Sequence, residues 1–309
     1  MLLFAATGDG IARLEDGRAE VVMRDGARCV AVDPTDRDLV YAGGAAGVSS
    51  SRDGGMTWEG SKLEADVFSV AVAVDGTVYA GSEPSALFTS SDQGRTWREL
   101  EALRSIPSAP TWSFPPRPWT SHVRWIAPSP HDAALLLVGI ELGGLMRSED
   151  AGATWADHRP GAQRDVHSLA WHPSATGRAY EAGGGGAAWS RDAGETWEPA
   201  DAGRDRHYTW AVAPDPGDAE RWFVSASPGP FAAHRVGRAE ARIYRWEGAG
   251  PWEPLTELLD AMPYVLAFSD DELVAGLADG RVMTSADGGE SWRSHKPEGD
   301  PIPRILGFA

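Results

Sequence analysis

The chain has 309 residues, with 45 acidic and 28 basic side chains, and its net charge is −17. This balance argues against a nucleic-acid binder and against adhesion to anionic membranes. The single cysteine, Cys29, excludes an intrachain disulfide and a cysteine-based zinc site, and no apolar run is long enough to cross a bilayer. The first residues lack the basic region of a signal peptide, so we expect a cytoplasmic protein.

A repeated octad of the form Ser-x-Asp-x-Gly-x-Thr/Ser-Trp dominates the sequence. It occurs five times, at residues 51–58, 90–97, 148–155, 190–197 and 285–292. Two degenerate copies, at 13–20 and 245–252, keep an acidic residue at the Asp position. The copies follow one another at intervals of about 40 residues, with two longer gaps, and a unit of that length is typical of a propeller blade.

Each unit contains the pattern of four short strands. Residues 28–33 predict a first strand, 38–43 a second and 47–51 a third, and Trp58 lies at the start of a fourth. Residues 2–6 match a second strand, and residues 304–309 end as a first strand without successors. We therefore predict that the two ends join in one blade, which closes the ring and removes its open edge.

The predicted fold is all-β, a single seven-bladed β-propeller domain over residues 1–309. Two insertions, at 104–121 and 226–238, lie on the rim opposite the octads. The predicted blades cover residues 1–25 plus 302–309, 26–63, 64–103, 120–160, 163–203, 205–257 and 261–297.

The five octads resemble Asp boxes, also called BNR repeats. The whole chain is similar to Asp-box β-propellers, a superfamily that includes sialidases, xyloglucan-cleaving glycosidases, the sortilin ectodomain and photosystem II assembly factors. This resemblance implies the propeller fold and leaves the function open, because one fold hosts many activities. Aspartates in tight turns accept backbone N–H groups, so we interpret the octad aspartates as structural.

Polar residues gather at the start of three consecutive first strands, in blades four to six. Aligned on the proline that follows each strand, they occupy two positions two residues apart, which share a face of a strand. The first position holds His122, Asp165 and Tyr208, and the second holds Arg124, His167 and Trp210. The matching pairs in blades two and three are read as Gly26/Arg28 and Phe68/Val70.

This asymmetry predicts a pocket on the rim that carries the insertions, because clustered titratable groups mark functional sites. The catalytic candidates are His122, Glu141, Asp165, His167, Glu181, His207 and Tyr208. The substrate-binding candidates are Arg124, Arg206, Trp210, Trp119 and His234. A divalent metal ion, if one is bound, would take His122, His167 and His207 as ligands.

We expect the pocket to bind an anionic or polar small molecule and the protein to be a hydrolase or lyase. A sialidase-like glycoside hydrolase is the first alternative, with Glu141 and Glu181 as a carboxylate pair. A non-catalytic scaffold or assembly factor that binds another protein is the second. We expect neither a nucleic acid nor a membrane as a partner.

Overall fold

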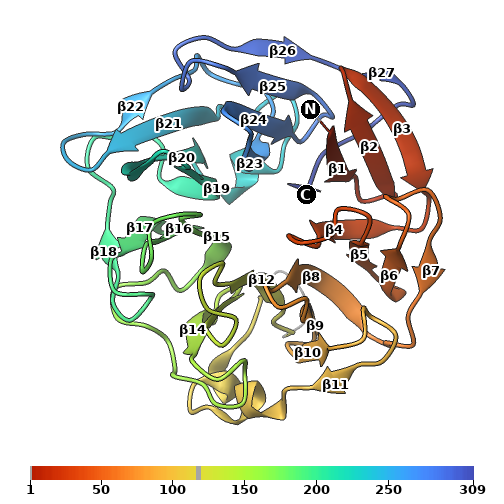
Figure 1. The fold of residues 1–309 in the computed structure, drawn as a ribbon. Coiled ribbons are helices and arrows are strands. Elements are labelled where there is room, and N and C mark those ends of the chain that lie inside the picture. The colour runs from red at the N-terminus through yellow and green to blue at the C-terminus, as the bar shows by residue number, and fades with distance from the viewer. Residues whose placement is uncertain (1, 116–119) are drawn as a thin grey trace.

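The computed structural model describes residues 2–115 and 120–309, and these residues form seven β-sheets arranged in a ring (Figure 1). Each sheet has one central strand, which contacts the central strands of both neighbouring sheets. The central strands are β28 (Gly307–Phe308), β4 (Ala27–Val32), β8 (Asp66–Val72), β12 (Val123–Pro128), β15 (Val166–Trp171), β19 (Tyr208–Asp215) and β23 (Pro263–Ser269). The predicted seven-bladed propeller is confirmed.

The other strands follow outward in antiparallel order. The second strands are β1 (Leu2–Ala6), β5 (Val40–Gly44), β9 (Val78–Glu83), β13 (Leu136–Ile140), β16 (Ala179–Gly183), β20 (Asp218–Ser227) and β24 (Glu272–Leu277). The third strands are β2 (Ile11–Glu15), β6 (Gly47–Ser51), β10 (Leu87–Ser90), β14 (Gly144–Ser148), β17 (Gly186–Ser190), β21 (Arg242–Glu247) and β25 (Val282–Ser285). The fourth strands are β3 (Arg18–Met23), β7 (Glu59–Gly60), β11 (Arg98–Glu99), β18 (Glu198–Pro199), β22 (Glu253–Pro254) and β26 (Arg293–His295).

The fourth blade lacks a fourth strand among the described residues, and a single bridge between Arg147 and Ala156 stands in its place. The insertions contain three short helical turns: η1 (Glu101–Ser105), η2 (Ala109–Thr111) and α1 (Pro230–Ala233). Within the described ranges, no helix has the length and apolar character that a bilayer span requires.

The two ends of the chain close the ring in the first blade. As predicted, β28 pairs with β1, and Ala5 lies opposite Phe308. A second pairing was not predicted: β27 (Glu298–Gly299) lies parallel to β3 at the outer edge of the same sheet. The segment from β27 to β28 therefore covers both edges of the first blade, which protects its unpaired backbone groups.

The octads form the turns that follow the third strands. In the first of them, Asp53 accepts hydrogen bonds from the backbone N–H and the hydroxyl of Thr57, at 2.8 and 2.6 Å. The Trp58 indole N–H donates to the carbonyl of Gly55. The other four octads repeat the aspartate bonds. This network satisfies the turn locally and fits the structural interpretation of the aspartates.

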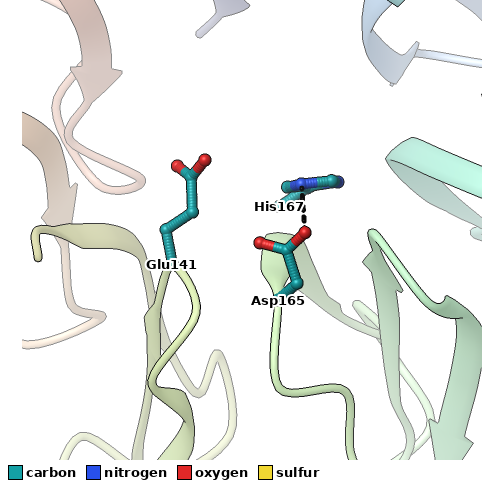
Figure 2. A group of neighbouring side chains, drawn as sticks. All are labelled: Glu141, Asp165 and His167. Carbon is teal, nitrogen blue, oxygen red and sulfur yellow. Dashed lines mark ion pairs between the residues drawn. The ribbon is translucent and has the colours of Figure 1, made fainter. Parts of the chain in front are cut away.

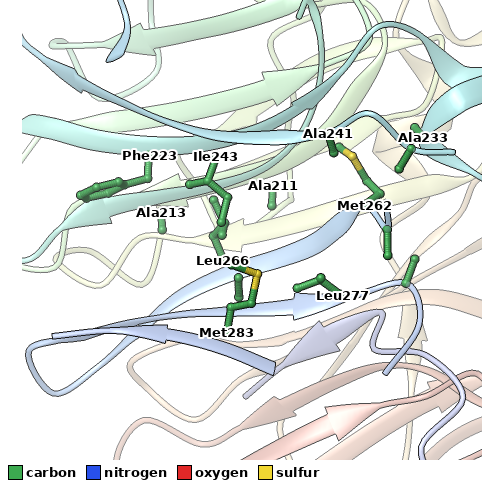
Figure 3. Close-up of a cluster of buried hydrophobic side chains, with 14 of the residues drawn as sticks. Ala211, Ala213, Phe223, Ala233, Ala241, Ile243, Met262, Leu266, Leu277 and Met283 are labelled. Carbon is green, nitrogen blue, oxygen red and sulfur yellow. The ribbon is translucent and has the colours of Figure 1, made fainter. Parts of the chain in front are cut away.

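The core consists of apolar layers between neighbouring blades. Figure 3 shows one such layer, in which Phe223 and Ile243 of the sixth blade pack against Leu266 and Met283 of the seventh. All four side chains are at least 95% buried, with exposed fractions of 0, 0, 5 and 4%. Burial of such layers supplies most of the stability of the ring.

A glycine on the second strand of one blade makes room for a branched side chain at the start of the central strand of the next blade. A Cβ added at Gly139 would lie 2.4 Å from Cγ1 of Val166, the first residue of the next central strand. The same clash would occur between Gly43 and Val67, Gly81 and Val123, and Gly276 and Ile305. We call these four pairs the glycine contacts. They set how closely adjacent blades approach.

A carboxyl group, that of Glu181, lies in an apolar layer between the fourth and fifth blades. Glu181 is fully buried on β16, opposite Leu169 and Ala188 on the two neighbouring strands. One of its oxygens accepts the backbone N–H of Gln163 at 2.9 Å, and the other has no hydrogen-bond partner. Burial raises the pKa of this carboxyl to about 8, because an unpaired charge in an apolar layer is costly.

We predict that Gly139→Ala lowers the free energy of unfolding by about 1–3 kcal/mol, because the added methyl group cannot fit against Val166. Adding Val166→Ala to this variant should recover part of the loss. Urea denaturation measures both effects. The matched control is Gly60→Ala, where a Cβ would meet nothing within 4 Å. Equal losses at the two glycines would contradict the steric explanation.

We predict that Glu181→Gln changes how stability depends on pH. The pKa rises from 4.5 to about 8 on folding, so its stabilising contribution is complete below pH 4.5 and is lost as the pH rises through 8. Glutamine cannot ionise. The variant should therefore gain about 2 kcal/mol or more over the parent between roughly pH 5 and pH 9. Urea denaturation across this range tests it, and a constant difference would contradict it.

Candidate functional site

A β-bulge occurs at the same place in the central strands of blades two to seven. There the register with the second strand shifts across one or two residues of the central strand. Such a bulge re-aims the side chain at the shift. The residues at this position are Arg28, Phe68, Arg124, His167, Trp210 and Tyr264.

The register confirms the predicted alignment of blades two, four, five and six and corrects that of blade three. Phe68, not Val70, occupies the bulge position there, and Asp66 precedes it by two residues. Asp66 forms an ion pair with Arg28 of the second blade. The third central strand carries no proline that could have anchored the alignment, which explains the two-residue error.

A cavity of about 290 Å³ lies where these bulged residues meet. Side chains from five of the six bulges line it, together with one residue from each insertion and four that lie next to the strand ends. Its lining residues are Arg28, Phe68, Phe114, His122, Arg124, Glu141, Trp210, His234, Tyr264, Arg304 and Leu306. The cavity therefore draws on every blade except the fifth, and not only on blades four to six.

Glu141 directly follows β13 and contacts two other residues that line the cavity. Its carboxylate is 2.6 Å from Nε2 of His122 and 3.7 Å from Nε of Arg124. Burial by itself would raise the pKa of Glu141, but the His122 hydrogen bond and the Arg124 charge outweigh it and lower the pKa to about 2. Glu141 is thus a buried carboxylate that stays ionised at neutral pH.

His122 is held between aromatic rings and carboxylates. Its ring lies 4.3 Å from that of Phe68 and 5.5 Å from that of Phe114, measured between centroids. Its Nδ1 atom is 3.2 Å from a carboxylate oxygen of Glu83. The side chain is 4% exposed, so packing fixes the direction in which it meets Glu141.

His167 lies beside the cavity wall, behind Trp210. Its ring centroid is 4.4 Å from that of Trp210 and 4.8 Å from that of Tyr208. Nδ1 lies 2.6 Å from the carbonyl oxygen of Thr209, and Nε2 lies 3.5 Å from a carboxylate oxygen of Asp165. Figure 2 shows Asp165 and His167 from the fifth blade on one side and Glu141 from the fourth blade facing them.

A chain of polar groups runs along the other side of Trp210. The hydroxyl of Tyr208 lies 3.5 Å from Nε2 of His234, and Nδ1 of His234 lies 2.9 Å from the hydroxyl of Tyr264. Burial raises the pKa of Tyr208, and the nearby charges of Asp165 and Glu141 raise it further. Burial lowers the pKa of His234, which keeps its imidazole neutral near pH 7.

Six of the described candidates do not line the cavity. Asp165, His167 and Tyr208 lie beside it, in contact with residues that line it or with one another. The other three lie elsewhere. Glu181 is buried in an apolar layer, as described above. Arg206 turns to the rim, where it donates to the carbonyl of Glu240 and pairs with Asp205. His207 is exposed to solvent. Another candidate, Trp119, lies outside the described residues.

The predicted ligand set of three histidines is not the set that the structure brings together. Glu141, Asp165 and His167 each offer a ligand atom, and these atoms lie within 4.8 Å of one another. Among the described residues, neither His122 nor His207 belongs to such a group. His122 instead touches Glu141, one member of the group.

Six residues that line the cavity were not among the candidates from sequence: Arg28, Phe68, Phe114, Tyr264, Arg304 and Leu306. The signal for three of them was the bulge position, which repeats in the central strands of blades two to seven. Arg304 directly precedes Ile305, the branched residue of one glycine contact, and Asp165 directly precedes Val166, the branched residue of another. By the same alignment, Leu306 is the bulge equivalent of the first blade.

No family model matches this sequence, and no curated protein matches it. Solved structures do resemble it. The GH74 xyloglucanase from Xanthomonas campestris superimposes with a TM-score of 0.64 and 18% identity, over 95% of this chain and 47% of that enzyme. An ancestral GH74 enzyme superimposes with a TM-score of 0.66 and 15% identity, over 99% of this chain and 39% of that enzyme. This chain thus spans less than half the length of either enzyme.

A third similar structure, YCF48 bound to D1 peptide, gives a TM-score of 0.59 with 20% identity, over 87% of this chain and 81% of that one. At these identities the likeness extends to the fold alone. The chain is a seven-bladed β-propeller that is closed by both chain ends, and its five octads have the Asp-box pattern.

Proposed function

We propose that the cavity binds an anionic small molecule and that the protein acts on this ligand as a hydrolase or lyase. The observation that carries this proposal is the arrangement of three arginines around one small cavity, in a chain whose net charge is −17. Arg28, Arg124 and Arg304 reach it from three different blades. Guanidinium groups bind carboxylates and phosphates through paired hydrogen bonds.

Packing orients two of these guanidinium groups. Arg28 lies over the ring of Phe68 at 4.5 Å, and Arg124 lies over that of Trp210 at 4.9 Å. Nε of Arg124 is buried and has no hydrogen-bond partner among the described residues. Arg304 is exposed, and no carboxylate in the described ranges forms an ion pair with it. A ligand anion would supply the missing acceptors.

The neighbouring side chains can move protons, which both hydrolysis and elimination require. Glu141 with His122 forms one hydrogen-bonded pair, and Tyr208, His234 and Tyr264 form a second group. The aromatic rings of Phe68 and Trp210 reduce the access of water and strengthen electrostatic contacts with the ligand.

We predict that Arg304→Gln and Arg28→Gln each weaken binding of small carboxylates and phosphate esters by about tenfold or more, because each removes a charged hydrogen-bond donor. A thermal-shift screen identifies the ligand, and calorimetry then measures its dissociation constant. Arg206→Gln is the matched control, since Arg206 pairs on the rim. Equal binding by all four proteins would refute the anion site.

A second candidate function is glycoside hydrolysis, which the spacing of Glu141 and Asp165 favours. Their nearest ligand atoms lie within 4.8 Å, close to the separation of about 5 Å in retaining glycosidases. Glu181, the partner expected from sequence, is sealed away from the cavity. The similar GH74 enzymes are consistent with this alternative.

If the protein is a glycosidase, Glu141→Gln should reduce turnover of aryl glycosides or xyloglucan by about 100-fold or more, and Glu181→Gln should leave it nearly unchanged. Product release from these substrates measures the effect. Absence of turnover by the folded parent protein would eliminate this candidate.

A third candidate is a protein-binding scaffold, as YCF48 bound to D1 peptide illustrates for a similar fold. The observation in its favour is Phe231 on α1, which is 88% exposed three residues before His234. Loss of protein capture in a Phe231→Ser variant, with small-molecule binding absent from the parent, would favour the scaffold over the enzyme.

A further inference from the structure

We propose that Glu141, Asp165 and His167 hold a divalent transition-metal cation at the edge of the cavity. The inference deepens the proposed function, on which its catalytic role rests, but the site itself stands on separate contacts. The three residues come from adjacent blades, with Glu141 after β13 and the other two at the start of β15. Their ligand atoms lie within 4.8 Å of one another.

The first argument concerns the proton of His167. Its Nδ1 atom lies 2.6 Å from the carbonyl oxygen of Thr209, and a carbonyl can only accept a hydrogen bond. Nδ1 therefore carries a hydrogen, which leaves Nε2 as the ring nitrogen that can offer a lone pair. This pattern, with one ring nitrogen bound to a carbonyl and the other free, is typical of metal-binding histidines.

The second argument is that Nε2 is buried without a hydrogen-bond partner. His167 has no exposed surface, so water outside the protein does not satisfy this atom. It faces a carboxylate oxygen of Asp165 at 3.5 Å. Two lone pairs that face each other in a buried place repel, unless a proton or a cation lies between them.

Distance favours the cation over the proton. A charge-assisted hydrogen bond between an imidazolium and a carboxylate would be about 2.7–2.9 Å long. Two ligands held about 2.1 Å from a tetrahedral cation lie roughly 3.4 Å apart. The observed 3.5 Å matches the second value. The ligand atom of the third residue, Glu141, lies within 4.8 Å of the other two, so it has to come roughly one ångström closer to reach the separation of about 3.4 Å.

The charges around the site also suit a cation. Glu141 and Asp165 together supply two negative charges, and one oxygen of Asp165 is buried without a hydrogen-bond partner. His122 binds the Glu141 carboxylate at 2.6 Å and so orients it. Arg124 competes for the same carboxylate at 3.7 Å, which sets a limit on how tightly a cation binds.

The ligand types indicate which metal would bind. One imidazole and two carboxylates suit Zn²⁺ or Mn²⁺ better than Ca²⁺ or Mg²⁺, which prefer oxygen ligands alone. Three protein ligands leave at least one coordination position for water or substrate. A cation there could polarise the bound anion or lower the pKa of a water molecule, while the arginines hold the other end of the ligand.

The test is binding of the metal alone. The full chain is stripped with a chelator and titrated with Zn²⁺ and with Mn²⁺, and elemental analysis and calorimetry measure the bound ion. We expect about one ion per chain, and a loss of affinity of about 100-fold in Asp165→Asn, which keeps the shape of the side chain. His207→Ala, which removes the exposed histidine of the predicted set, should bind like the parent.

Circular dichroism and thermal unfolding confirm that each variant is folded. Glu141→Gln provides a second variant from another blade, so the result does not depend on Asp165 alone. No bound ion in the folded parent, or equal affinity in Asp165→Asn, would overturn the site. If Arg304→Gln loses anion binding while metal binding is absent throughout, the cation site fails and the anion pocket stands. If instead the metal binds as expected while no anion binds to the parent, the anion pocket fails and the cation site stands.

Discussion

The close approach of neighbouring blades at the glycine contacts is the constraint on which the rest of the ring depends. A branched side chain at the start of one central strand fits where the preceding blade has only a glycine, as Val166 does at Gly139. This contact fixes the height and angle of each central strand relative to the next one. In three of the four contacts, the residue directly after the branched side chain is the bulged residue of the strand. Packing on one side of the strand therefore determines where the next side chain points.

This order of events explains how a structural repeat builds a polar cavity. The bulge follows the glycine contact in blades three, four and five, so Phe68, Arg124 and His167 are carried to the same level around the ring. The insertions then add Phe114 and His234 above them. The octad turns lie after the third strands and take no part in the cavity. The repeated residues thus serve the ring, and the variable residues meet at its centre.

Much of this could be predicted from the sequence, because the octads are spaced at regular intervals and the ends of the chain match complementary strands. The alignment on Pro130, Pro173 and Pro216 identified His122, Asp165, Arg124 and His167 correctly as neighbours on adjacent strands. Strand alternation alone could not reveal the bulge, so the roles of Arg28, Phe68 and Tyr264 were missed. Nor could it show that Glu181, on a different face from Tyr180, turns into a blade interface.

The bulge also separates two requirements that usually conflict in a folded chain: constant packing between the blades and variable side chains at the binding site. A bulged residue such as Phe68 or Arg124 lies at the register shift and outside the glycine contact before it. Its size and charge can change while the frame keeps its geometry. The ring therefore offers one exchangeable position per blade at a common centre, much as a set of loops does on an antibody. A propeller of this kind can acquire a new ligand through a few substitutions without having to rebuild its core.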